Sequence, residues 1–415
     1  MNTAAFLDDI RSFRGFGRET KVRETRSASF SGEPVSVATF VNEFWTSRQR
    51  AAHSLHELSY RACFKPQLPR FFIERLTAPG DHVYDPFMGR GTTPLEAALL
   101  GRVPLGCDVN PLSEMLVRPR LHPPQMDEIE QRLAEIDLDA ATAVRTDLKV
   151  FYHPETLREI CALRDYLHAR EQRGELDALD RWIRMVAVNR LTGHSPGFFS
   201  VYTLPPNQAV TVAQQRKINL RRNQKPPRRD VREIILRKTR SLLRDCDDET
   251  RRVLANAGKD ARFLTQPAGS VPGIPGDSVR LVVTSPPFLD IVNYAQDNWL
   301  RCWFCGIDAG SVGITMARKL EEWQAAMSEV FRELARVLTP SGHVAFEVGE
   351  VRTGTVNLEE AVIPCGIAAE LSPVCVLIND QHFTKTSNCW GVENRSKGTN
   401  TNRVVVFRKR QAASE

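Results

Sequence analysis

The sequence has no apolar run long enough to cross a membrane. A membrane-spanning helix needs about 20 consecutive apolar residues, whereas the hydrophobic residues, 42% of the 415, are spread along the chain in shorter runs. The N-terminus also lacks the apolar stretch of a signal peptide. We therefore expect a soluble cytoplasmic protein, long enough for two or three folding units.

Close cysteine pairs are also scarce. Of the nine cysteines, only Cys302 and Cys305 lie close together in the sequence. A structural zinc site usually needs a second pair of ligands, so the sequence predicts no metal site. We interpret these two cysteines as core residues of an aromatic, helical stretch in a reducing cytosol.

An unusual strand end lies at residues 284–288, which read Thr-Ser-Pro-Pro-Phe after an apolar run. Proline has no N–H and cannot continue a central strand, so the strand over 280–284 must stop and a stiff loop must follow. The hydroxyl of Ser285, the backbone carbonyls and the ring of Phe288 would suit a flat ring that bears an amino group. A proline-rich strand end that binds nothing is the alternative.

A second segment, residues 81–93, predicts a short strand, a turn with two glycines and then a helix. Gly89 and Gly91 allow a positive φ and a close approach of the backbone to a ligand. We expect Thr92 or Thr93 to cap the helix. The layout resembles dinucleotide-binding folds but lacks their three-glycine fingerprint.

A further strand, over residues 103–108, ends in an acid. The carboxylate of Asp108 could accept hydrogen bonds from both hydroxyls of a ribose. A helix cap or a turn acid is the alternative role. The spacing from Gly89 favours the ribose.

Together these segments resemble the DNA amino-methyltransferases that use S-adenosylmethionine. Residues 85–93 match the cofactor loop of that family, and residues 284–288 match its catalytic motif. The motif has the form typical of cytosine-N4 enzymes, because adenine-N6 enzymes more often carry an acid where Ser285 stands. Phe288 replaces the family's usual tyrosine and keeps the stacking face.

The resemblance covers residues 60–115 and 275–408 and implies roles for individual residues. The implied catalytic residues are Ser285, Pro286, Pro287 and Phe288. The implied cofactor-binding residues are Phe64, Lys65, Pro66, Asp85, Pro86, Phe87, Gly89, Gly91, Thr92, Asp108 and Asn110. Ser285 and the carbonyl of Pro286 would each accept one amino hydrogen of an extruded base, on which Phe288 would stack. No cysteine stands beside a proline in a catalytic turn, which argues against carbon-5 methylation.

Positive charge is concentrated between Arg216 and Arg240, with eleven Lys or Arg residues and only two acids. Phosphate contact is the natural use of such a segment, and a solvated helix face is the alternative. The predicted DNA-binding residues are Arg216, Lys217, Arg221, Arg222, Lys225, Arg228 and Arg229. The amides interleaved with them could contact adenine edges; they are Gln214, Gln215, Asn219, Asn223 and Gln224.

The loop over residues 192–200 is rich in turn-forming residues and carries Phe198 and Phe199. These rings could stack on a base or wedge into DNA. We favour packing of the loop on the protein itself.

The alternation of strands and helices predicts an α/β fold with a mainly parallel sheet covered on both faces. We expect a Rossmann-like class I methyltransferase sheet with a mainly helical inserted domain. The predicted divisions are a partly disordered N-terminal extension (1–59) with a helix over 40–62, a cofactor-binding part (60–115), a helical, basic insertion for target recognition (116–260) and a catalytic part (261–410). Ligands of such sheets bind at the carboxyl ends of the strands, which brings Asp85, Asp108 and Ser285 to one rim.

The function expected from the resemblance is site-specific methylation of cytosine N4 in duplex DNA, with S-adenosylmethionine as the methyl donor. A prokaryotic restriction–modification system with a cognate restriction endonuclease is the expected setting. Adenine-N6 methylation, RNA base methylation and non-catalytic binding of nucleic acid are the alternatives.

Overall fold

The computed structural model describes residues 2–46, 52–60, 63–140, 143–203, 209–287, 294–313, 319–348, 350–351, 356–380 and 401–410. Its α-helices are α1 (Thr3–Ser12), α2 (Gln67–Leu76), α3 (Thr92–Leu99), α4 (Leu112–Val117), α5 (Met126–Glu135), α6 (Pro154–Gln172), α7 (Ala178–Arg190), α8 (Val212–Arg221), α9 (Val231–Leu243), α10 (Asp248–Gly258), α11 (Tyr294–Cys305), α12 (Leu320–Val337) and α13 (Leu358–Ala368). Three short 3₁₀ helices are η2 (Ser54–His56), η3 (Arg118–Leu121) and η4 (Thr146–Val150). Within the described ranges, no helix is both long and apolar enough to cross a membrane.

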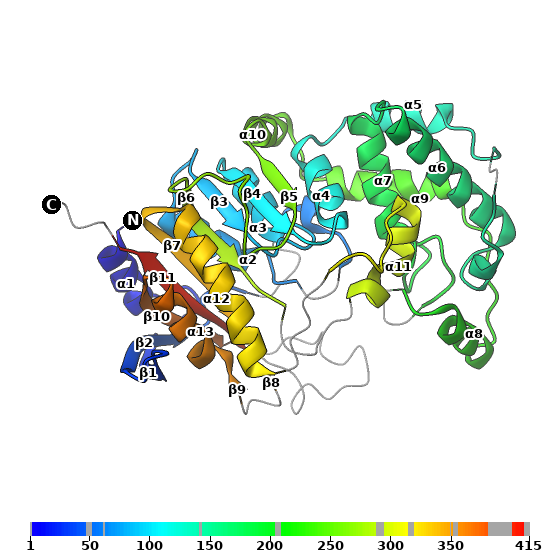
Figure 1. Ribbon diagram of the computed structural model, residues 1–415. Helices are drawn as coiled ribbons and strands as arrows, with labels where there is room; N and C mark the ends of the chain where they lie inside the picture. The colour runs from blue at the N-terminus through cyan, green and yellow to red at the C-terminus, as the bar shows by residue number, and fades with distance from the viewer. Residues whose placement is uncertain are drawn as a thin grey trace.

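The strands are β1 (Lys21–Ala28), β2 (Pro34–Asn42), β3 (His82–Asp85), β4 (Val103–Asp108), β5 (Arg262–Thr265), β6 (Val279–Thr284), β7 (Leu338–Val348), β8 (Glu350–Val351), β9 (Val356–Asn357), β10 (Leu371–Asp380) and β11 (Thr401–Lys409). One sheet has the order β1-β2-β10-β11-β7-β6-β3-β4-β5, and β8 pairs with β9 separately (Figure 1). From β7 to β5 all neighbours are parallel, whereas β11 runs antiparallel between β7 and β10. This arrangement confirms the predicted Rossmann-like class I fold.

Apolar residues alternate along the central strands between the two faces of the sheet. On β7, Val344 and Phe346 pack with α12 and α13, whereas Ala345 packs on the opposite face with α1 and α2. Such a period of two with both sets apolar is what a strand buried on both faces requires. The sheet core is therefore specified directly by the sequence of its strands.

The N-terminal segment differs from the prediction. Residues 3–42 form α1, β1 and β2, and β2 adds to the main sheet by parallel pairing with β10. The predicted helix over 40–62 and the predicted disorder near the N-terminus are wrong. The reason is a period of two: Val37 packs on one face of the sheet and Phe40 on the other.

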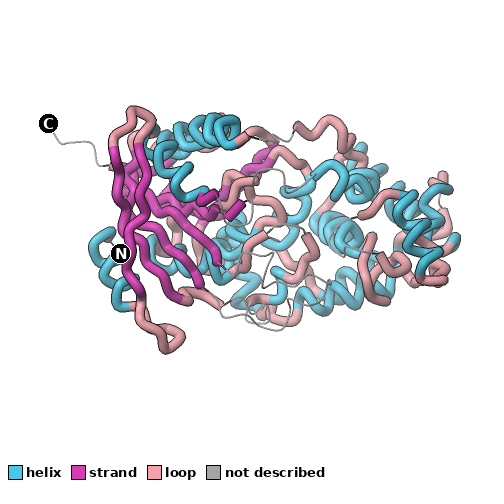
Figure 2. The backbone as a smooth tube through the Cα atoms, turned by 90° about the horizontal axis from the view of Figure 1, so that it is seen from below, coloured by secondary structure: helices cyan, strands magenta, loops and turns pink. Residues whose placement is uncertain are grey.

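Helices α5 to α9 form a helical unit beside the sheet; seen from below, the strands gather on one side and these helices on the other (Figure 2). The core of this unit includes Trp182 on α7 and Ile235 on α9, but also Leu58, between η2 and α2, and Phe304 on α11. The packing thus crosses the boundaries predicted at 59/60 and 260/261. The division into domains stays a prediction.

Two local predictions about this unit are confirmed. Cys302 and Cys305 are buried core residues of α11. Phe198 and Phe199 are also buried, and the guanidinium of Arg190 lies 4.0 Å from the centre of the Phe198 ring. The loop over 192–200 therefore packs on the protein.

Candidate active site

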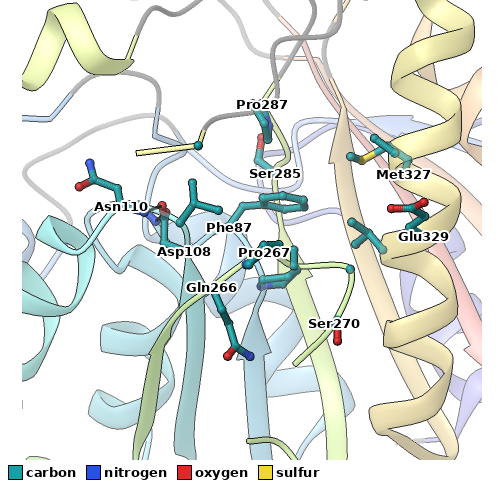
Figure 3. A pocket seen from close by; sticks show the side chains of 18 of the residues that line it. Phe87, Asp108, Asn110, Gln266, Pro267, Ser270, Ser285, Pro287, Met327 and Glu329 are labelled. Atoms are coloured by element: carbon teal, nitrogen blue, oxygen red, sulfur yellow. Dashed lines mark hydrogen bonds between the residues drawn. The ribbon is translucent and has the colours of Figure 1, made fainter. Parts of the chain in front are cut away.

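A cavity of about 360 Å³ lies at the carboxyl ends of β3, β4, β5 and β6 (Figure 3). Its lining comes from the loop after β3, the end of β4, residues 266–270 after β5, the loop after β6 and one side of α12. Cavities of this size accommodate small-molecule ligands. The position is the one that parallel α/β sheets use for binding.

The loop after β3 is shaped by its two glycines. Gly89 and Gly91 have φ values of +48° and +76°. A Cβ atom on Gly91 would lie 2.0 Å from a methyl carbon of Val117, whereas one on Gly89 would approach nothing closer than 3.7 Å. Gly91 is thus required by packing and by conformation, and Gly89 by conformation alone.

The start of α3 corrects one prediction. Gly91 is the N-cap residue and no side chain caps the helix, so capping by Thr92 or Thr93 is wrong. Both threonines are buried in the first turn, and Thr93 Oγ1 donates to the carbonyl of Val283 over 3.1 Å. The threonine therefore joins α3 to β6 instead of closing the helix end.

Asp85 joins the loop after β3 to the end of β6. Its carboxylate accepts from Thr284 Oγ1 over 2.6 Å and from the N–H of Phe87 over 3.1 Å. Burial raises the pKa of Asp85 to about 7, although these hydrogen bonds act to lower it. Its side chain is 1% exposed and lies under the cavity, outside the lining that is described.

Asp108 lines the cavity at the end of β4. Its Oδ2 accepts from the N–H of Gly89 and its Oδ1 from the N–H of Asn110, both over 2.9 Å. Burial raises the pKa of Asp108. Each carboxylate oxygen offers a second lone pair, so this side chain can order the turn and still accept hydrogen bonds from ligand hydroxyls.

Ser285 stands beside a carboxylate that the sequence analysis missed. Glu347, at the end of β7, accepts from Asn402 Nδ2 over 3.0 Å, and the Ser285 side chain is close enough to act to lower the pKa of Glu347. Burial raises the pKa of Glu347, which is 7% exposed. The signal was a single acid within the apolar run of residues 344–348, since a lone carboxylate in a buried strand needs a partner.

The two prolines after Ser285 fix the loop against α12. The carbonyl of Pro287 accepts from the indole N–H of Trp323 over 3.1 Å, and Pro286 is buried. Phe288 lies outside the described residues. A rigid loop therefore presents the Ser285 hydroxyl to the cavity.

The structure brings only part of the predicted set to the cavity wall. Seven of the predicted catalytic and cofactor-binding residues line it: Pro86, Phe87, Gly89, Asp108, Asn110, Ser285 and Pro287. The described lining does not include the others, which are Phe64, Lys65, Pro66, Asp85, Gly91, Thr92 and Pro286. The roles of all these residues stay predictions.

Two further parts of the wall were not predicted. Residues 266–270 close one side, and the N–H of Gln266 donates to the carbonyl of Asp108 over 3.1 Å. Met327 and Val330 of α12 close another. The turn-forming residues after the strand at 262–265 could have indicated the first of these two parts. The residues of α12 could not be distinguished by sequence from ordinary helix core.

Comparison with known proteins gives a family for part of the chain. A family model of N6/N4 methylases, described as DNA methylase, matches residues 19–114. Residues 19–114 are thus similar to the DNA methylases of the N6/N4 family. The match begins just before β1 and therefore includes the N-terminal hairpin of β1 and β2.

Two curated proteins that are similar to parts of this chain are Type II methyltransferases. M.MjaII from Methanocaldococcus jannaschii is 31% identical over 113 residues, which are 27% of this chain and 20% of that protein. M.BsoBI from Geobacillus stearothermophilus is 21% identical over 295 residues, which are 65% of this chain and 56% of that protein. The chain thus spans about half the length of these relatives, or less. Among solved structures, TrmN from Thermus thermophilus is 14% identical, with a TM-score of 0.31 and coverage of 86% of this chain and 51% of that one.

The predicted DNA-binding cations of the basic segment, residues 216–240, divide into two classes by their surroundings. Arg216, Lys217 and Arg221 on α8, and Lys225 after it, are exposed. Arg222 is exposed too, with its guanidinium 3.9 Å from the centre of the Tyr202 ring.

The second class, Arg228 and Arg229, contacts α6 of the same protein. The Arg228 guanidinium pairs with Glu155 and Glu159 of α6, and Arg229 is half-buried and accepts through its carbonyl from Thr156. Partners on α6 thus hold Arg228 and Arg229 in place. Contact with phosphates is best supported for the exposed class.

Three of the predicted base-reading amides are used within the protein. Gln215 and Gln224 both donate to the carbonyl of Tyr202, over 3.1 and 2.9 Å, and Asn219 donates to that of Val150 over 2.8 Å. These three amides are therefore engaged within the protein, and base contact through them stays a prediction. Gln214 also acts locally, in the capping box of α8 with Thr211.

Proposed function

We propose that the protein transfers the methyl group of S-adenosylmethionine to the exocyclic N4 of cytosine in duplex DNA. The observation that carries this proposal is that Ser285 lines the same cavity as Asp108 and Gly89. An amine held at Ser285 would therefore stand beside a donor held at Asp108. The DNA methylase match supports DNA as the substrate, and the Type II relatives support a restriction–modification setting.

The cavity residues fit S-adenosylmethionine. Asp108 would accept from the ribose hydroxyls, and Gly89 lets the backbone approach closely. Phe87, Pro267 and Met327 offer apolar surface to the adenine ring. When bound, the cofactor supplies an electrophilic methyl group on a positively charged sulfur.

The side chains at the rim can activate a weakly nucleophilic amine. The lone pair of an exocyclic amine is delocalised into the ring, so the enzyme must fix its direction. Because the Ser285 side chain lies beside the carboxylate of Glu347, Ser285 would give its own hydrogen to that carboxylate and keep its oxygen lone pairs for an amino hydrogen. The carbonyl of Pro286 would accept the other amino hydrogen, and the fixed geometry would supply much of the rate.

Glu347 also completes the proton balance. After the methyl group has moved to nitrogen, the amine gives one proton to Ser285 Oγ while the Ser285 hydrogen passes to the carboxylate. The raised pKa of Glu347 suits it to that task. The target base must leave the duplex first, because its amine is otherwise engaged in pairing.

The choice of cytosine rests on Ser285, which stands where an acid is more usual in adenine-N6 enzymes. To test the proposal, labelled S-adenosylmethionine is incubated with the protein and unmethylated genomic DNA, and the DNA is digested to nucleosides. We expect label in N4-methyldeoxycytidine. Label in N6-methyldeoxyadenosine would overturn the base, label in competing tRNA but not in DNA would overturn the substrate, and no label in either would overturn the activity.

A further inference from the structure

The outer face of α8 combines cations with an exposed apolar side chain. Leu220 is 82% exposed, and Arg216, Lys217 and Arg221 are exposed on the same helix. Residues three or four apart share a face, so Leu220 lies between Arg216 and Lys217. Burial of a leucine side chain is favourable, and Leu220 gains little of this stabilisation within the described protein.

The inner face of α8 is held firmly. Gln215 and Ile218 are buried, and the donors of Gln215 and Asn219 reach backbone carbonyls outside the helix. Gln224 anchors the segment after the helix to the carbonyl of Tyr202. The helix therefore presents its outer face in a fixed orientation, without the entropy cost of ordering it on binding.

The position of α8 suits a partner that also reaches the rim of the sheet. In Figure 1, α8 lies at the lower edge of the helical unit. Low in the same view lies β8, which closely follows the carboxyl end of β7. In this view, α8 and the segment after β7 therefore lie on the same lower side of the molecule.

We propose that this outer face, defined by Arg216, Lys217, Leu220 and Arg221, enters the major groove of duplex DNA with Leu220 against the base edges. The inference rests on the proposed function and adds the element that reads the sequence. An α-helix with side chains is about 10–12 Å wide, which matches the groove width of about 12 Å. The cations would neutralise the flanking phosphates.

Leucine has no hydrogen-bonding group, so the base edge that it favours is the methyl group of thymine. The recognition sequence should therefore contain an A·T pair at the position that Leu220 contacts. Arg216, Lys217 and Arg221 would contribute affinity that is largely independent of sequence.

The test uses the full chain, expressed in a bacterial host without DNA methylation, and maps modified bases across the genome. Leu220→Ala should relax selection at one A·T position by about tenfold while cofactor affinity is kept. Phe30→Ala is the matched control, because Phe30 is also apolar and exposed, at 59%, but lies on the β1–β2 hairpin. It should leave the methylated sequence unchanged.

Three results would overturn the inference. An unchanged methylated sequence and rate in Leu220→Ala would remove Leu220 from the interface. A uniformly lower rate at the same sequence would make α8 a phosphate-contact helix only. A wild-type chain that leaves the genome unmethylated, yet folds and binds S-adenosylmethionine, would remove the proposed function itself and this inference with it.

Discussion

The rim of the sheet and the outer face of α8 use charge in opposite ways. At the rim, Asp85 and Glu347 are enclosed, and burial raises the pKa of each. On α8, Arg216 and Lys217 are open to solvent. An enclosed acid acts on the few atoms that it touches, whereas an exposed cation acts through a field that salt screens. Chemistry and DNA affinity should therefore be separable by mutation.

The largest effect is expected at the rim. Ser285→Ala removes the acceptor for one amino hydrogen, and we expect methyl transfer to fall by about 10²–10³-fold. The cofactor affinity should stay within about twofold, as measured by calorimetry. An active Ser285→Ala protein would contradict the role of Ser285.

The next effect concerns Glu347, which acts through Ser285. Glu347→Gln should lower the single-turnover rate by about 10²-fold. Because the pKa of Glu347 is raised, the wild-type rate should increase with pH as this carboxyl deprotonates. The variant should lose that increase. A slower variant with an unchanged pH profile would reduce Glu347 to a structural role.

Asp108 should control the cofactor more than the methyl-transfer step. Asp108→Asn keeps the shape but loses the charged acceptor, so we expect a 10- to 100-fold weaker Kd for S-adenosylmethionine, from about 1.5–3 kcal/mol. The rate at saturating cofactor should change far less. Unchanged affinity would leave Asp108 only as the acid that orders the turn at Gly89 and Asn110.

A smaller and salt-dependent effect is expected on α8. Replacing Arg216, Lys217 and Arg221 together with alanine should reduce the slope of log K against log salt by about 3 for duplex DNA. The matched control replaces Lys21, Arg23 and Arg26 on β1, which are also exposed and carry the same charge. Equal slopes for the two triple variants would show that α8 has no special place in DNA binding.

The last effect concerns stability and leaves the methyl-transfer step aside. The raised pKa of Asp85, about 7, means that the folded state binds a proton which the unfolded state has released above pH about 4. The free energy of unfolding should therefore fall by up to about 1.4 kcal/mol per pH unit between pH 4 and 7. Asp85→Asn should remove that dependence in denaturant titrations, and the exposed Glu33→Gln should keep it. A wild type whose stability does not fall over this range would contradict the burial argument.

Much of the rim of the sheet could be predicted, because the motifs that form it are local in the sequence. Strand ends at Asp85, Asp108 and Ser285 follow short apolar runs, and in a parallel sheet these ends must share one rim. The N-terminal hairpin was missed because β1 is an edge strand with only Thr25 buried, so it shows no apolar period.

The sequence also did not predict which side chains pair with individual polar residues. Glu347 meets Ser285 only through the pairing of β6 with β7, and Arg228 is neutralised by acids 69 and 73 residues away. The sequence around Glu347 or Arg228 gives no indication of partners that lie so far away along the chain. Charge counts along a segment therefore predicted a basic surface, but not which cations remain open on it.

The most direct test compares Ser285→Ala with the triple variant of Arg216, Lys217 and Arg221 in single-turnover methyl transfer to duplex DNA. The two are measured at low salt with saturating DNA and cofactor. We predict that the triple variant recovers a rate close to that of the wild type, whereas Ser285→Ala stays slower by at least about 10²-fold. Recovery of Ser285→Ala under these conditions would contradict the claim that the rim holds the reacting amine.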